Sequence, residues 1–243
     1  MVVEEMRDVL AYLVERESEF ARHLSVARML EARVNEVVSA DSIQIEVRHV
    51  NTLKSGLLIH LYNIVEAVAT RTLTVVGRTV VMEQPKRWTE SVLKEWVRAA
   101  IWNGDDRVGE GALARLTQVS GVLAAGGSPD AFVVKGEPGS WDDEAIKKIA
   151  KRLGCPLVLT DEVKRAAYER VYRDETTALK YLARRRNDIA HGQSTFEEGA
   201  HDLTLDDLAG LANRVLPFLT AVTKSYEKFL SSKGYLTVEE VAA

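Results

Sequence analysis

Residues 53 to 73 read Leu53-Lys-Ser-Gly-Leu-Leu-Ile-His-Leu-Tyr-Asn-Ile-Val-Glu-Ala-Val-Ala-Thr-Arg-Thr-Leu73. The apolar side chains in this stretch recur at intervals of three, four and seven residues, which is the spacing of a helix buried along one face. Those positions are Leu53, Leu57, Leu58, Leu61, Ile64, Val65, Val68 and Leu73. The sequence therefore predicts a long buried helix, which we expect to end at Gly77.

Helical spacing also dominates the rest of the chain. Residues 1 to 38 contain neither glycine nor proline and predict one or two long helices, whereas the run from Ile43 to Val47 resembles a short strand. Further helices are expected at about 91–102, 110–124, 140–153, 161–172 and 174–191, and from 204 onward. Ser140 and Thr204 are expected to begin capping boxes, and Pro217 is expected to kink the last helix. The predicted fold is an all-α helical bundle.

The elements group into one expected domain over residues 1–232. Its core comprises residues 1–77 and 136–232, and residues 78–135 form a helical elaboration inserted in the middle. Residues 233–243 are expected to form a C-terminal tail. A chain of 243 residues is long enough to bury such a core without disulfides or metal.

Composition narrows the class of protein. The single cysteine, Cys155, cannot close an intramolecular disulfide, and neither cysteines nor histidines cluster at zinc-binding spacing. We therefore expect a reducing compartment and no metal or other cofactor. No apolar run approaches the ~20 residues of a membrane span, and the acidic N-terminus does not resemble a secretory signal. These features predict a cytoplasmic protein that does not enter the membrane.

The net charge of −4 gives no global attraction to a polyanion, so contact with nucleic acid requires a local basic patch. Residues 164 to 191 carry eight lysines and arginines against four acidic residues. Lys180, Arg184 and Arg185 are our candidate RNA contacts. An ordinary solvated helix face explains the same pattern equally well.

One motif carries potential chemistry. Residues 184 to 192 read Arg184-Arg-Arg-Asn-Asp-Ile-Ala-His-Gly192. The bare pattern of an arginine followed, after four to six residues, by a histidine is expected about once by chance in such a chain, and Arg16 with His23 also matches it. On a helix, Asn187 and His191 share a face, whereas Arg186 lies about 140° away from His191.

Arg186 and His191 can therefore meet at one phosphate in three ways. The helix can distort at Gly192, the arginine side chain can reach around, or a two-fold dimer can bring two copies of the motif together. The alternative is structural: His191 caps the helix beside a surface cluster of arginines.

The stretch Arg186-Asn-Asp-Ile-Ala-His-Gly192 resembles the signature of the HEPN superfamily, in which an arginine and a polar residue precede a histidine. Residues 61–67 resemble the inner helix of a prokaryotic, toxin-like branch of these proteins. Three further segments resemble its C-terminal half, namely 143–154, 188–196 and 203–211. The resemblance covers most of the chain apart from 78–135.

The resemblance implies a metal-independent endoribonuclease in which a ribose 2′-hydroxyl attacks the adjacent phosphate. His191 would move a proton, Arg186 would stabilise charge on the phosphoryl oxygens, and Asn187 would orient the substrate or the histidine. Glu66 matches an acidic position that can pair with Arg186 or His191, although a solvent or salt-bridge role remains open for it. Asn63, on the same helix face as Glu66, and Asp188 are further candidates for supporting roles.

The resemblance further implies a homodimer acting as a toxin or antiviral effector, with RNA as substrate and an antitoxin or defence-system protein as partner. Gln193 stands where some HEPN toxins carry a tyrosine, so regulation through that tyrosine is not expected. A catalytically inactive HEPN module that binds RNA or a partner protein remains an alternative, because a fold does not establish an activity. A helical scaffold in which the motif occurs by chance is a further alternative.

Overall fold

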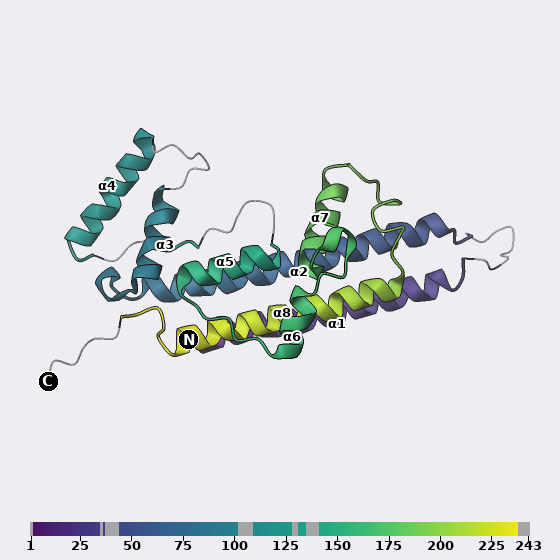
Figure 1. The fold of residues 1–243 in the computed structure, drawn as a ribbon, viewed down its shortest axis with the longest axis horizontal. Helices are drawn as coiled ribbons and strands as arrows, with labels where there is room; N and C mark the ends of the chain where they lie inside the picture. Colours follow the sequence, from purple (N-terminus) through teal and green to yellow (C-terminus); the bar gives the residue numbers. More distant parts are fainter. Residues whose placement is uncertain are drawn as a thin grey trace.

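The computed structural model describes residues 2–34, 36, 44–101, 109–127, 131–134 and 141–237. Within these residues it contains eight α-helices and two 3₁₀ helices. Three long helices form its axis: α1 (Val2–Glu31), α2 (Val47–Val81) and α8 (Leu205–Ser231). They run side by side along the length of the molecule and all contact one another (Figure 1). The predicted all-α bundle is confirmed.

Shorter helices surround this axis. They are α5 (Asp143–Leu153), α6 (Asp161–Tyr168) and α7 (Ala178–Ala190). α6 contacts α7 and α8, and α7 contacts both α2 and α8. The remaining pair, α3 (Glu90–Ile101) and α4 (Glu110–Ala124), lies at one end of the molecule, where α3 contacts α5 (Figure 1). This pair falls within the segment that the sequence marked as an elaboration.

The predicted apolar stripe lies in the core from Leu57 to Leu73, whereas Leu53 is exposed. Leu58, Leu61 and Val65 are fully buried in a hydrophobic cluster that extends through all three long helices. Thr204 begins α8 with the expected capping box, in which its hydroxyl accepts the Asp207 amide at 3.0 Å. Of the other predicted capping box, Ser140 lies outside the described residues, and Asp142 caps α5 by accepting the Ala145 amide.

The prediction that Gly77 ends the second helix is wrong, because α2 continues to Val81. Gly77 has a different role. A Cβ atom added there would lie 2.1 Å from the backbone oxygen of Phe132, so the glycine allows residues 131–134 to lie directly against the helix. The predicted strand is also wrong over its described part, since residues 44–46 have no regular structure and Val47 begins α2. Ile43 lies outside the described residues.

Two helix boundaries differ from expectation around residue 174. α6 ends at Tyr168 rather than near 172, and α7 begins at Ala178 after Thr177 caps it by accepting the Lys180 amide. Between them, Asp174 and Glu175 have φ angles of 59° and 51°, a left-handed conformation that a continuous helix does not permit. At the far end, α8 continues as a helix through Pro217.

The first residues of the expected C-terminal tail pack against the bundle. Tyr235 is buried, its backbone oxygen accepts the Thr89 amide at 2.9 Å, and the Thr237 amide donates to the Arg87 backbone oxygen at 2.8 Å. These contacts join the end of α8 to the start of the α3–α4 pair. None of the helices in the described part of the chain is both long and apolar enough to cross a membrane.

Candidate functional site

The candidate site is set by the way α7 packs on α2. Leu179, Leu182 and Ile189 are buried and lie on one face of α7. Arg186 follows Leu179 by seven residues and Leu182 by four, so it belongs to this same inward face rather than to the solvent face. The arginine therefore points toward α2, and its side chain is 21% exposed.

Three groups hold the Arg186 guanidinium. Its carbon lies 4.0 Å from the centre of the Tyr62 ring, a cation–π contact. Nη2 donates to Oε2 of Glu66 at 3.1 Å, and Nη1 donates to Oδ1 of Asn187 at 2.9 Å. Tyr62 is fully buried, and its hydroxyl oxygen accepts the Trp141 amide at 3.1 Å. A ring, a carboxylate and an amide thus fix the orientation of the guanidinium.

His191 lies at the other side of the motif. It is the C-terminal cap of α7, with its amide donating to the Asn187 backbone oxygen at 2.9 Å, and its side chain is exposed. Gly192 follows with a φ angle of 71°, the left-handed conformation expected for a residue that ends a helix. Across the described residues, the His191 side chain makes no hydrogen bond or ion pair, with Arg186 or with any other group.

The backbone turn after α7 is closed by Asp188. Its carbonyl oxygen accepts the amides of Gln193 and Ser194 at 2.8 and 3.1 Å. This arrangement brings the chain back past the end of the helix and fixes the position of His191. Asp188 thus supports the motif through its backbone.

On α2, Asn63 and Glu66 share one face, as the sequence predicted, and Thr70 continues the same row. Asn63, Glu66 and Thr70 are all exposed and line one open surface depression together with Ala67 and Arg71. Glu66 is the member of this row that reaches α7, through its ion pair with Arg186. The structure thus places Glu66 beside Arg186 and does not bring Asn63 into a hydrogen bond within the described part of the chain.

The comparison with known families decides the relationship. The chain matches the family HEPN_MAE_28990-like HEPN over residues 9–235. The chain belongs to this HEPN family. HEPN domains are all-α and are generally associated with RNA cleavage and toxins. No curated protein and no solved structure with significant similarity was found.

The cations beside the HEPN motif are already paired with acids. Arg184 lies 3.6 Å from Asp174, and Lys180 lies 3.6 Å from Glu144. The arginine and the lysine both remain partly exposed, and surface ion pairs of this kind contribute little to stability. They are therefore available to a phosphate that competes with the carboxylate.

Arg185 is placed differently from its neighbours. It forms an ion pair with Asp202, and its Nε donates to the Tyr181 hydroxyl oxygen at 3.1 Å. Its side chain is 14% exposed. Burial raises the pKa of Tyr181, so the phenol stays neutral. These contacts tie the loop after the HEPN motif to α7, and they leave Arg185 the least accessible of the three candidate RNA contacts.

Sequence reasoning missed Tyr62 and Trp141. The Tyr62 ring contacts the Arg186 guanidinium, and the Trp141 amide holds the Tyr62 hydroxyl. One signal was present: Tyr62 precedes Glu66 by four residues, so both lie on the same side of α2. A tyrosine inside an apolar stripe has a polar hydroxyl that needs a partner when buried. The role of Trp141 depends on its backbone amide, which no side-chain pattern reveals.

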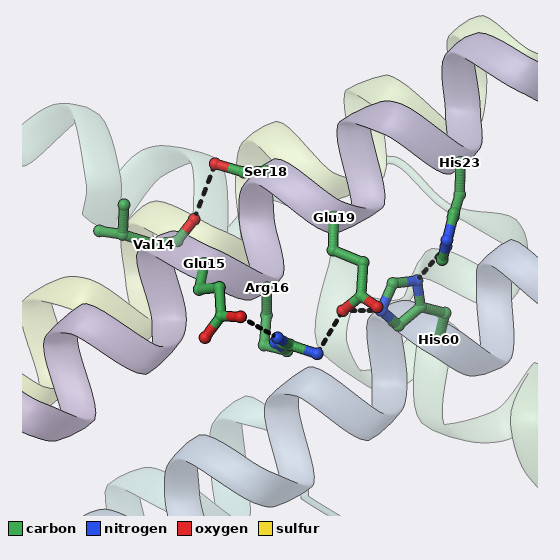
Figure 2. Close-up of polar contacts among 7 residues, drawn as sticks. All are labelled: Val14, Glu15, Arg16, Ser18, Glu19, His23 and His60. Carbon is green, nitrogen blue, oxygen red and sulfur yellow. Dashed lines mark hydrogen bonds and ion pairs between the residues drawn. The ribbon is translucent and has the colours of Figure 1, made fainter.

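The second match to the arginine–histidine pattern also forms a cluster. Arg16, Glu19 and His23 of α1 meet His60 of α2 (Figure 2). Burial lowers the pKa of His60, and the nearby Glu19 carboxylate opposes that effect. Within the described residues, no group of three or more histidine, cysteine, aspartate or glutamate side chains is arranged to hold a metal ion.

Proposed function

We propose that this HEPN domain is a metal-independent endoribonuclease. The ribose 2′-oxygen attacks the adjacent phosphorus, the bond to the 5′-oxygen breaks, and the products carry a 2′,3′-cyclic phosphate and a 5′-hydroxyl. His191 moves a proton in this reaction, and Arg186 stabilises the negative charge that develops on the phosphoryl oxygens. The observation that carries the proposal is the fixed Arg186 guanidinium, held by Tyr62, Glu66 and Asn187.

Fixed orientation suits catalysis. A guanidinium that is already positioned costs no reorganisation when charge develops on the phosphate. Asn187 holds Arg186 through its side chain and is joined to His191 through its backbone, so it links the two catalytic groups. Glu66 acts as a positioning residue for Arg186, and Lys180 and Arg184 guide the RNA backbone to the site.

We propose further that the active form is a homodimer with composite sites. Within one chain, Arg186 pairs with Glu66 of α2, while the His191 side chain is exposed and, among the described residues, forms no hydrogen bond with it. A two-fold axis near the end of α7 would set Arg186 of one copy beside His191 of the other. In the cell, we expect such a dimer to act in the cytoplasm as a toxin or antiviral effector, restrained by an antitoxin or a defence-system protein.

The first test uses the purified full chain with a labelled single-stranded RNA. Arg186→Ala and His191→Ala should each abolish cleavage while the far-ultraviolet circular dichroism stays unchanged. Arg184→Ala, on the solvent face of the same helix, is the matched control and should mainly weaken binding. An RNA with a 2′-deoxy sugar at the cut site should resist. Wild-type cleavage by His191→Ala would overturn the proposal.

Mixing two inactive variants tests the composite site. Arg186→Ala still has His191, and His191→Ala still has Arg186. If the site forms between chains, random mixing gives mixed dimers that contain one intact site, and activity should return to about one quarter of wild type. If each site forms within one chain, no activity returns. Sedimentation of the wild-type chain should show a dimer.

A second candidate function is an inactive HEPN module that binds RNA or a partner protein. The observation that favours it is the neutralisation of Arg186 by Glu66 at 3.1 Å. Under this alternative, wild type binds RNA or a partner but never cleaves. Absence of cleavage even with cell extract, combined with retained binding, would favour the module over the enzyme.

A further inference from the structure

A basic groove lies between α5 and α6. It is lined by the exposed side chains of Lys147 and Lys151 on α5, by Lys164 and Tyr168 on α6, and by residues of the connecting segment 154–159. Its volume of about 640 Å³ falls within the range of about 300–1,000 Å³ that is usual for ligand sites. None of the described residues that line it is acidic. The groove therefore suits an anion.

The three groove lysines differ from the cations beside the HEPN motif, each of which is paired with a carboxylate. Within the described part of the chain, Lys147, Lys151 and Lys164 form no ion pair. Like charges gathered around one groove repel one another, and they do so in a chain whose net charge is −4. A bound anion would relieve this repulsion.

Tyr168 gives the groove a fixed aromatic ring. The ring packs edge-on against the buried Phe218 of α8, with 6.0 Å between the two centres. Nζ of Lys147 lies 4.8 Å from the centre of the Tyr168 ring, a cation–π contact that positions the ammonium group. Burial raises the pKa of Tyr168, so the phenol stays neutral and adds no negative charge to the groove.

The helix that carries two of these lysines begins beside the Arg186 site. The Trp141 amide, just before α5, donates to the Tyr62 hydroxyl oxygen, and the Tyr62 ring contacts the Arg186 guanidinium. In the first turn of α5, the Glu144 carboxylate pairs with Lys180 of α7 at 3.6 Å. The start of α5 is thus held by both α2 and α7 at the candidate site.

The face of α5 that meets α7 leads into the groove. Lys147 and Lys151 follow Glu144 by three and seven residues, so the three side chains share one face. From Glu144 to Lys151 the helix rises about 10 Å. Over this length α5 runs along α2 and away from α7 (Figure 1). A polyanion that leaves the Arg186 site along this face therefore meets the groove lysines in succession.

We propose that Lys147, Lys151 and Lys164 bind the phosphate backbone of RNA beside the segment held at the Arg186 site. Lysine suits this role because its compact charge contacts a phosphate without regard to the base. Continuity with the Arg186 site favours RNA over an acidic peptide, and the inference rests in this respect on the proposed function. The groove contributes affinity and takes no part in the chemical step.

Fluorescence anisotropy of the full chain with a single-stranded RNA methylated at its 2′-oxygens is the test. The groove variant carries Lys147→Gln, Lys151→Gln and Lys164→Gln. Each phosphate contact contributes about 0.7 to the salt dependence of single-strand binding, so the salt dependence should fall by about 2. Between 50 and 200 mM salt, the groove variant should then lose about 18-fold less affinity than wild type loses. The change should be the same for RNAs of different sequence, because phosphates carry no base identity.

The matched control variant carries Lys86→Gln, Lys94→Gln and Lys228→Gln, which remove the same charge from exposed lysines outside the groove. Its salt dependence of binding should be that of wild type. Saturating RNA should bring both variants to the wild-type kcat, whereas only the groove variant should have a raised KM. As a direct measure of location, bound RNA should protect the groove lysines, and not the control lysines, from acetylation detected by mass spectrometry.

Two outcomes would overturn the groove proposal alone. One is a groove variant that binds RNA with the wild-type affinity and salt dependence. The other is a groove variant that loses binding to polyglutamate and keeps its binding to RNA, which would assign the groove to an acidic protein. A wild-type chain that binds RNA through these lysines and never cleaves would support the groove and contradict the endoribonuclease. Absence of RNA binding by wild type would overturn both.

Discussion

Glu66→Gln separates two effects of the ion pair with Arg186. The substitution removes one charge and keeps the shape of the side chain. Glu66 is 49% exposed, so its pair with Arg186 at 3.1 Å contributes at most about 1 kcal/mol to stability. For a chain of 243 residues this corresponds to a change in Tm below about 4 °C. The fold should therefore survive.

Glu66→Gln should strengthen RNA binding and slow RNA cleavage. Without the carboxylate, Arg186 can form one more phosphate contact, which makes binding tighter and steepens its salt dependence by about 0.7 for single-stranded RNA. Between 50 and 200 mM salt, the variant should then lose about 2.6-fold more affinity than wild type loses. Cleavage should slow by up to about 100-fold, because the guanidinium loses one of the groups that orient it.

Fluorescence anisotropy with an RNA methylated at its 2′-oxygens measures binding without cleavage, and single-turnover assays measure the rate. Glu144→Gln is the matched control, because Glu144 pairs with Lys180 on the same helix at 3.6 Å. It should change the salt dependence of binding but not the cleavage rate. A Glu66→Gln variant with the wild-type salt dependence and the wild-type rate would show that Glu66 neither shields nor positions Arg186.

Three further predictions concern the fold and the chemistry. Gly77→Ala should lower the free energy of unfolding by about 1–3 kcal/mol because the added methyl group meets the Phe132 backbone. Gly56→Ala should raise the free energy of unfolding by up to about 1 kcal/mol because nothing lies within 4 Å of the added methyl group. Urea unfolding measures both changes. Burial raises the pKa of Cys155 to about 12, so iodoacetamide at pH 8 should modify it only after unfolding, as mass spectrometry can follow. The wild-type chain should cleave RNA at the same rate with and without EDTA. Cleavage that EDTA abolishes and magnesium restores would contradict the mechanism.

The fold was largely predictable because its signals are local. Apolar spacing along residues 53–73 reports which side of α2 is buried, and the Thr204 capping box marks where α8 begins. The end of α2 was not predictable in the same way. A glycine favours helix ends on average, but Gly77 lies inside α2, where its missing side chain makes room for residues 131–134. This contact joins segments more than 50 residues apart, so local spacing does not reveal it.

The site was predictable in its residue types and not in its assembly. The spacing of Arg186 and His191 already implied that they lie on different faces of one helix, and in the described part of the chain no hydrogen bond joins the two side chains. The sequence could not show which face is inward. That depends on Leu182 and Ile189, whose burial against α2 commits Arg186 to Tyr62 and Glu66.

The contacts that hold Arg186 limit how Arg186 and His191 can act on one phosphate. Moving Arg186 toward His191 of the same chain would break its contacts with Tyr62, Glu66 and Asn187 together, and would expose a side chain that is now four-fifths covered. Bringing a second His191 to the fixed Arg186 breaks none of these contacts, because the histidine side chain is exposed at the end of α7. The two-fold dimer therefore costs less free energy within the chain than a reach of Arg186 around the helix.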